Sequence, residues 1–397
     1  MSTTAMIQTS NYYNILENKY FQQIKSKIDN SDFALDEKSH FKIKKIVIDN
    51  IIYYMVNYKK NYLNNENINE LGYLRSLIFD ENCNLLCFSP VKSSYKNKFF
   101  ENNKNKQELI VEPLFEGTMI NLFYDNRVNK WLISTKSTIG ANINYFKNSI
   151  NKSKTFKEMV DDAMNNDNID LAKLNKDEVF SFVLQHPENR IVNLFNYPKL
   201  ILIEKYRIQQ NNINFLEMAS LNSLIKFNFE FNIEYGPYNN DIQVPPNIMG
   251  CVIKNHVNNQ RIKYRNPTFE YVKELRGNQP KLEYTYLQLR KNGRLREYLK
   301  WYPEHSNEMI LFRDKIHKFN INLYNNYVGC YIKKVKPLKA YPFEYKNHMF
   351  ELHEIYKKEK KTQRKSMQYP DIINYTNDLH ESKLMFSLNY NFRNKKD

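Results

Sequence analysis

The segment FSFVLQHPENRIV, residues 180–192, decides the fold that we expect. Its first half is rich in aromatic and β-branched residues, and Pro187 ends this strand because proline cannot donate a ladder hydrogen bond. Similar apolar runs, separated by polar turns such as Asp125-Asn126-Arg127, lie at residues 72–80, 84–89, 108–117, 118–125, 130–135, 178–186, 199–208 and 251–255. The pattern predicts a strand-rich, antiparallel domain with one helical insert near residues 155–171.

The flanks of this domain have a helical pattern. Apolar residues recur at spacings of three and four within residues 13–70 and again from about residue 281 to residue 390. We therefore predict an α+β chain with three parts. These are a short helical N-terminal region at 1–70, a domain with antiparallel sheets at 71–280 and a basic α-helical C-terminal domain at 281–397.

Composition limits the class of protein. The chain has 397 residues, a formal net charge of +16 and 14% aromatic residues, which is too aromatic for a disordered chain. Eight glycines exclude collagen-like and dinucleotide-fingerprint architectures. The four cysteines lack the paired spacing of a zinc site, so no metal site is predicted. No secretory signal is visible, and residues 46–56 are too short and polar to span a bilayer. We expect an intracellular, cytoplasmic protein with reduced thiols and no membrane partner.

The basic excess lies mainly near the C-terminus. Residues 281–397 hold 24 Lys and Arg against 13 Asp and Glu. Such clusters either contact the phosphates of a polyanion, here RNA, or form a solvated helix face. The candidate RNA-binding residues are Lys333, Lys334, Lys336, Lys339, Lys357, Lys358, Lys360, Lys361, Arg364 and Lys365.

Four segments, read in order, carry the functional argument. They are LRSLIFD with the following CFSPVKSSYKNKFFEN, EPLFEGTMINLFYD with WLISTKSTIGA, FSFVLQHPENRIV with LILIEKYRI, and IMGCVIKN with RIKYRNP. Their order and spacing resemble the nucleotidyltransferase domain of bacteriophage-type ATP-dependent RNA ligases over residues 70–275. The third segment matches best, since that family has a strand FEFV, then a proline, then NRIV. The C-terminal half resembles proteins of large DNA viruses.

The resemblance implies covalent adenylyl transfer with ATP and Mg²⁺, in which a lysine of K-x-D-G becomes lysyl-AMP and passes AMP to an RNA 5′-phosphate. Aligning Gly117 with the motif glycine puts Glu116 at the aspartate and Leu114 at the nucleophile. Ser181 and Met249 stand where that family has carboxylates, with the glycine after the second retained. A leucine cannot form a phosphoramidate, so the chemistry is expected to be lost or strongly altered.

The resemblance also implies a set of phosphate contacts. Arg75 matches a phosphate-binding arginine, and the basic residue before the motif is Lys92 by spacing or Lys98 by its local KFF sequence. Lys136 lies in a phosphate-binding segment. The closing K-x-K is Arg261-Ile262-Lys263, and such side chains suit polyanions. Tyr206 falls near the position that stacks the nucleobase; a core aromatic is the alternative.

Three functions follow from these features. The first is an RNA-ligase-like protein that binds RNA or a nucleotide without ordinary adenylyl transfer. The second is an active ligase that uses ATP, Mg²⁺ and a relocated lysine, Lys92 or Lys136. The third is a structural or assembly protein of a large DNA virus, present in the host cytoplasm or virion with viral protein partners.

Overall fold

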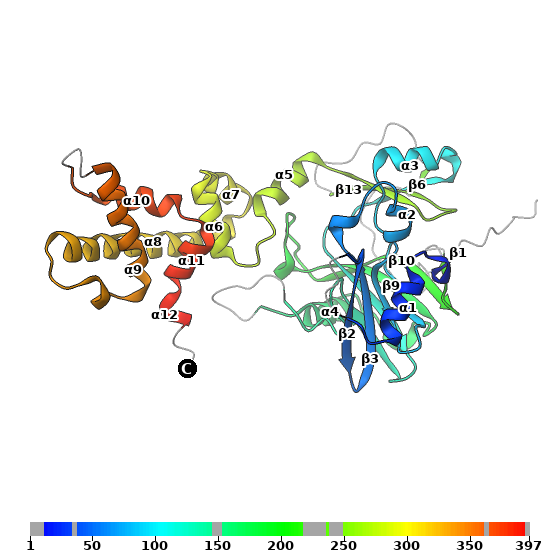
Figure 1. Ribbon diagram of the computed structural model, residues 1–397. Helices are drawn as coiled ribbons and strands as arrows, with labels where there is room; N and C mark the ends of the chain where they lie inside the picture. The colour runs from blue at the N-terminus through cyan, green and yellow to red at the C-terminus, as the bar shows by residue number, and fades with distance from the viewer. Residues whose placement is uncertain are drawn as a thin grey trace, which may run out of the picture. The chain divides into compact units, whose positions relative to one another are not determined.

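The computed structural model describes residues 12–33, 38–144, 153–216, 236–237, 249–360 and 365–393 (Figure 1). The chain divides into two compact units, and the boundary between Lys273 and Glu274 falls inside helix α5 (Pro267–Arg276). The first unit carries the sheets and the second is helical.

Three antiparallel sheets build the first unit. The largest has the order β1 (Tyr12–Asn14), β11 (Asn212–Leu216), β10 (Lys199–Gln209), β9 (Glu178–Gln185), β7 (Thr118–Asp125) and β8 (Lys130–Ser134). A second has the order β12 (Gly236–Pro237), β6 (Leu109–Pro113), β13 (Gly250–Asn255) and β14 (Arg261–Arg265). The third has the order β2 (Phe41–Ile48), β3 (Ile51–Tyr58), β4 (Arg75–Phe79) and β5 (Leu85–Cys87).

Four further helices belong to this unit: α1 (Phe21–Asp29), α2 (Ile68–Leu71), α3 (Lys96–Asn102) and α4 (Phe156–Asn166). The helical insert predicted near residues 155–171 is α4, which begins with a capping box between Thr155 and Glu158. Its apolar face buries Phe156 and Val160 against β9 and β10. The insert therefore closes one face of the largest sheet.

The helical prediction is wrong over residues 41–58. This stretch is the hairpin of β2 and β3, joined by Asp49 and Asn50, whose φ angles are 50° and 64°. Positive φ at both loop residues is the geometry of a type I′ hairpin turn, which Asp and Asn tolerate. The apolar residues recurred at a helix-like spacing, but isoleucine and valine are β-branched and pack well in a sheet.

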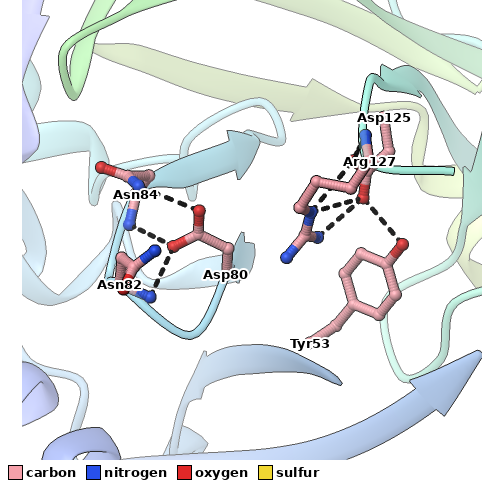
Figure 2. A network of polar contacts seen from close by, with 6 residues as sticks. All are labelled: Tyr53, Asp80, Asn82, Asn84, Asp125 and Arg127. Atoms are coloured by element: carbon pink, nitrogen blue, oxygen red, sulfur yellow. Dashed lines mark hydrogen bonds and ion pairs between the residues drawn. The ribbon is translucent and has the colours of Figure 1, made fainter. Parts of the chain in front are cut away.

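A polar network ties the third sheet to the largest one (Figure 2). The Tyr53 hydroxyl on β3 donates to Asp125 Oδ2 at the end of β7 over 2.7 Å. Arg127 chelates the same carboxylate and lies over the Tyr53 ring, with its guanidinium 4.9 Å from the ring centroid. The pKa of Asp125 is lowered because these hydrogen bonds outweigh the effect of its burial. Nearby, Asp80 accepts two backbone N–H groups, from Asn82 and Asn84, and closes the turn after β4.

The second unit is helical, as the periodicity predicts. After the end of α5 it contains α6 (Leu282–Lys291), α7 (Leu295–Trp301), α8 (Ser306–Tyr327), α9 (Phe343–Ile355), α10 (Tyr369–Asp378), α11 (Glu381–Leu388) and α12 (Tyr390–Arg393). The α+β class with antiparallel sheets and a helical C-terminal region is thus confirmed. Among the described residues, no helix is both long and apolar enough to cross a bilayer.

Candidate phosphate-binding site

One face of the β6-β13-β14 sheet is charged. Val252 pairs with Glu112 on one side and with Lys263 on the other, and one pair further along Lys254 faces Arg261. Residues that are opposite in antiparallel strands point to the same side, so these polar side chains share a face. The other face is apolar and packs against Phe99 of α3; its buried residues are Leu109, Val111, Cys251, Ile253 and Ile262.

Glu204 of β10 meets this charged face from the neighbouring sheet. Its carboxylate accepts from Arg261 Nη1 at 2.9 Å and from Lys254 Nζ at 3.3 Å, and the Tyr206 hydroxyl donates to its other oxygen. Burial alone would raise the pKa of Glu204, but Lys254 and Arg261 outweigh it and the pKa is lowered. The carboxylate is therefore ionised and fully engaged with protein groups.

Two more cations approach the same place. The Arg75 guanidinium donates to the Pro90 carbonyl oxygen at 3.1 Å, and Arg261 Nε donates to that of Val91 at 2.9 Å. The loop between β5 and α3 thus brings Lys92 beside both arginines. Burial lowers the pKa of Lys92, and Arg75, Arg265 and Arg261 lower it further. Of the predicted cations, the structure brings Arg75, Lys92 and Arg261 together here.

Lys263 is perturbed by the other cations of this cluster. Burial, followed by the charges of Arg261, Arg75, Arg265 and Lys92, lowers its pKa to about 6. Within the described part of the chain, no carboxylate lies within 4.0 Å of its ammonium. Its amine is therefore largely neutral at pH 7.5. We define the cation cluster as Arg75, Lys92, Arg261, Lys263 and Arg265.

Lys136 lies on the Arg75 side of the cluster. Asn57 and Ser76 donate to its backbone carbonyl at 3.1 Å each, which fixes the loop after β8. Burial lowers the pKa of Lys136, and so do the charges of Arg75, Lys42 and Lys60. Lys98 differs, because it pairs with Glu101 at 3.8 Å and perturbs none of the cluster lysines. The structure thus favours Lys92 over Lys98 at the position before the motif.

The centre of the motif has a structural role. Leu114 is 8% exposed, and its N–H donates to the Gly250 carbonyl oxygen at 3.0 Å. The buried Glu116 carboxylate accepts from the backbone N–H groups of residues 191–193 at 2.6 to 3.3 Å. Burial raises the pKa of Glu116, while these hydrogen bonds lower it. Glu116 thus holds the segment after β9 rather than a ligand.

Gly117 and Gly250 are required by sterics. Both have φ of +146°, a conformation that L side chains rarely adopt. A Cβ at Gly117 would lie 2.3 Å from the Leu184 carbonyl oxygen, and one at Gly250 would lie 1.9 Å from that of Tyr264. These glycines therefore let strands approach closely on both sides of Leu114.

Ser181 lies in an uncharged hydrogen-bond chain. Its hydroxyl donates to Asn121 Oδ1 at 2.7 Å, and the Asn121 amide donates to Ser89 Oγ at 2.7 Å. In the ladder, Ser181 pairs with Asn121 on one side and Glu204 on the other. The nearest carboxylate is thus one strand away from the position at which the resemblance expects it, and Arg261 and Lys254 already neutralise it.

Tyr206 and Met249 stand where the resemblance implies a base-stacking ring and a carboxylate. Tyr206 is 0% exposed and packs edge-on against Phe88 and Phe215, so the structure favours the core alternative. Met249 supplies only a backbone carbonyl, which accepts from the Asn266 N–H at 2.9 Å. No cluster of three or more metal-ligating side chains occurs among the residues described. The cations of the cluster suit phosphate groups.

Sequence reasoning did not single out Glu204, Lys254, Glu112 or Arg265. Glu204 carried a usable signal, because it is a lone carboxylate within the apolar run LILIEKYRI. A β-bulge between Leu202 and Glu204 also shifts the ladder there. Lys254 carried a weaker signal as the one charge of GCVIKN, and we find none for the other two.

The C-terminal cations that the structure describes lie on exposed side chains along separate segments. Lys333, Lys334, Lys336 and Lys339 follow α8, and the Lys336 ammonium lies 4.4 Å from the Tyr341 ring centroid. Lys357 pairs with Glu354 at 2.8 Å, and Lys358 and Lys365 are exposed. Lys361 and Arg364 lie outside the described residues, as does the side chain of Lys360. Their RNA-binding role stays a prediction.

Comparisons with known proteins give one kind of match. No protein-family model and no curated protein matches the chain. Fourteen chains of solved structures match, including two forms of an archaeal ATP-dependent RNA ligase. Form 1 is 12% identical over 74% of this chain and 77% of that chain, with a TM-score of 0.41. Form 2 is 11% identical over 78% and 82%, with a TM-score of 0.40. We rest no argument on scores this low.

Proposed function

We propose that the cation cluster binds the phosphate groups of a nucleotide or of an RNA end, and that adenylyl transfer through the Leu114 position is lost. The observation that carries this proposal is the charge imbalance at the site. The charges of Arg75, Arg261 and Arg265 lower the pKa of both Lys92 and Lys263. Two carboxylates face these cations, since Glu204 binds Arg261 and Lys254, and Glu270 binds Arg265. A surplus of positive charge in a partly buried place is unfavourable unless an anion compensates it.

The chemistry of the cluster favours phosphate over a carboxylate ligand. Arg75 offers a planar guanidinium, Arg265 offers the guanidinium nitrogens left beside its bond to Glu270 at 2.9 Å, and Lys92 adds a point charge. The largely neutral Lys263 amine can still donate an N–H, so several oxygens of one anion find donors together. Arg261 is less available because Glu204 and the Val91 carbonyl oxygen occupy two of its nitrogens. A polyphosphate chain or a nucleic-acid end supplies the larger negative charge.

The loss of adenylyl transfer at the motif position follows from its side chain. Leu114 has no lone pair, and Glu116 is held by backbone N–H groups. Both the nucleophile and a free carboxylate are therefore lacking at the positions where the resemblance expects them. If RNA is the ligand, the exposed lysines that follow α8 are a second set of candidate contacts to its backbone.

The test measures binding of ATP and of a 5′-phosphorylated RNA oligonucleotide by equilibrium dialysis. Arg75→Gln combined with Lys92→Gln should weaken both by at least tenfold, because each lost phosphate contact removes charge-assisted hydrogen bonds. The matched control is Lys173→Gln, since that lysine is 75% exposed and pairs only with Asp170. Thermal melts check that all three proteins are folded.

Salt dependence provides an independent reading. Four phosphate contacts to single-stranded RNA predict a log–log slope of about −3 between affinity and salt. A slope near zero, or equal loss of affinity in the Lys173 control, would contradict the proposal. For the helical unit, changing Lys333, Lys334, Lys336 and Lys339 together to Gln should weaken RNA but not ATP.

A further inference from the structure

Position 114 and Lys263 lie on the same face of the β6-β13-β14 sheet, with β13 between their strands. Leu114 extends β6 by one residue, since its N–H donates to Gly250, and Gly250 in turn pairs with Arg265 of β14. Lys263 precedes Arg265 by two residues, so both side chains point to the face on which a side chain at position 114 would lie. The sheet thus carries an amine on the same face as the missing one, two strands away.

We propose that Lys263 is the nucleophile that accepts a nucleotidyl group from a nucleoside triphosphate bound in the cation cluster. The proposal rests on the proposed function, because the triphosphate must first bind there. It differs from the family expectation, which puts the nucleophile at Leu114 and gives the K-x-K segment only phosphate contacts.

The surroundings of Lys263 fit this role in two ways. Burial lowers the pKa of the Lys263 amine most, and the charges of Arg261, Arg75, Arg265 and Lys92 lower it further. A triphosphate held by these cations offsets their charges, and burial continues to favour the neutral amine. A lysine beside other cations is a known way to obtain a reactive amine at neutral pH. Within the described residues, no carboxylate lies close enough to reprotonate or sequester it.

The other candidate lysines fit less well. Lys92 Nζ donates to the Ser93 carbonyl oxygen at 3.4 Å, which turns it toward its own loop. Burial and the charges of Arg75, Lys42 and Lys60 lower the pKa of Lys136. Arg261 and Lys263 are not among the groups that perturb it. Lys254 is engaged by the Glu204 carboxylate at 3.3 Å. Lys263 therefore has a neutral amine, a place on the sheet face of position 114 and hydrogen-bond donors around it for the phosphates.

The reaction balances with the triphosphate as the sole co-reactant. The lone pair of Lys263 Nζ attacks the α-phosphorus and forms a P–N bond, while the bond from that phosphorus to the bridging oxygen breaks. Pyrophosphate leaves with that electron pair, and one amine proton passes to solvent. A divalent ion would arrive bound to the triphosphate, since the described residues hold no cluster for it.

The experiment incubates the full chain with α-³²P-labelled ATP or GTP and Mg²⁺ or Mn²⁺, then measures label on the denatured protein. We expect label that survives alkali and is lost in acid, as a phosphoramidate is, and a modified peptide containing Lys263 by mass spectrometry. Lys263→Arg should lose the label because arginine is not a nucleophile, and equilibrium dialysis measures nucleotide binding by the same variant. The exposed control Lys173→Arg should retain the label.

Each outcome is decisive. Nucleotide bound without label in the wild type overturns this inference and leaves the proposed function standing. No nucleotide bound overturns both. Label that persists in Lys263→Arg, or that maps to Lys92 or Lys136, assigns the chemistry elsewhere and overturns the role of Lys263. A labelling rate that rises with pH through about 6 and then levels supports the neutral amine.

Discussion

Glu204→Gln tests whether one carboxylate holds the cation cluster together. Glu204 is 5% exposed and bonds to Arg261 and Lys254, whose side chains are 5% and 13% exposed. Glutamine keeps the shape and one acceptor, but each hydrogen bond loses its charge assistance, which costs about 1 kcal/mol per bond. Two cations are then left unpaired beside Arg75. Three hydrogen bonds reach this carboxylate, from Arg261, Lys254 and Tyr206. Their combined loss is about 3 kcal/mol, at the low end for breaking a buried ion pair.

Urea unfolding can isolate the first unit. The chain has two tryptophans, so in a Trp301→Phe background the fluorescence of Trp131 on β8 reports the sheet unit alone. We expect Glu204→Gln to lower the free energy of unfolding by about 3 kcal/mol at pH 7, a fall in melting temperature of about 6–12 °C for a unit of this size. The exposed Glu66→Gln is the matched control. A loss below about 1 kcal/mol would refute the ion-pair account.

The pH dependence of the stability difference between wild type and Glu204→Gln tests the ion-pair account independently. A carboxylate whose pKa is lowered on folding stabilises the protein above its unfolded pKa, and this stability is lost as the pH falls through the folded pKa. The difference between wild type and Glu204→Gln should therefore be full at pH 7 and shrink in acid. The variant should also bind ATP more tightly at low salt, because its cluster carries one more uncompensated positive charge. Unchanged affinity would argue against phosphate binding at this cluster.

Three more changes test neighbouring features. Gly250→Ala should destabilise the first unit by more than about 3 kcal/mol, because its Cβ would lie 1.9 Å from a carbonyl oxygen. Gly140→Ala, also at positive φ in this unit but with no atom nearer than 3.5 Å to the added Cβ, should cost about 1 kcal/mol in the same melts. Glu116→Gln should cost about 2 kcal/mol and speed amide exchange of residues 191–193, whose N–H groups would face an amide. Lys263→Met should stabilise the folded protein by about 1–2 kcal/mol at pH 6, and this gain should fade toward pH 10. The reason is that folding removes the proton of Lys263, which costs free energy only at a pH where the unfolded chain still holds that proton. A difference in stability that does not change with pH would contradict this.

The sequence predicted the strands and the cations better than their roles. The runs that form β7, β9 and β10 are strands of the largest sheet whose consecutive residues are buried, so their apolar side chains pack on both faces. The hairpin over residues 41–58 was mistaken for helix, since its spacing alone does not reveal that Asp49 and Asn50 take positive φ. A turn of two residues with that geometry outweighs periodicity in so short a segment.

The site was predictable where motif and chemistry coincide. Arg75, Lys92, Arg261 and Lys263 were chosen as phosphate contacts and do perturb one another. Glu204 was missed because its role depends on Arg261, 57 residues later in the chain and on another sheet. Glu116 was assigned to a nucleotide for a similar reason, since its donors come from a segment about 75 residues away. Such partners are set by tertiary packing.

Glycines and cations carry different weight as evidence for function. Gly117 and Gly250 look like remnants of a nucleotide pocket, yet a carbonyl oxygen lies within 2.3 Å of where a Cβ would stand at either one. The fold alone would exclude other residues there, whatever the chemistry. Lys263 is the opposite case, because its charge state is costly to the folded protein and a methionine would pack without that cost. A residue that lowers stability at its own position needs a reason outside folding, and an anion bound by the surrounding cations supplies one.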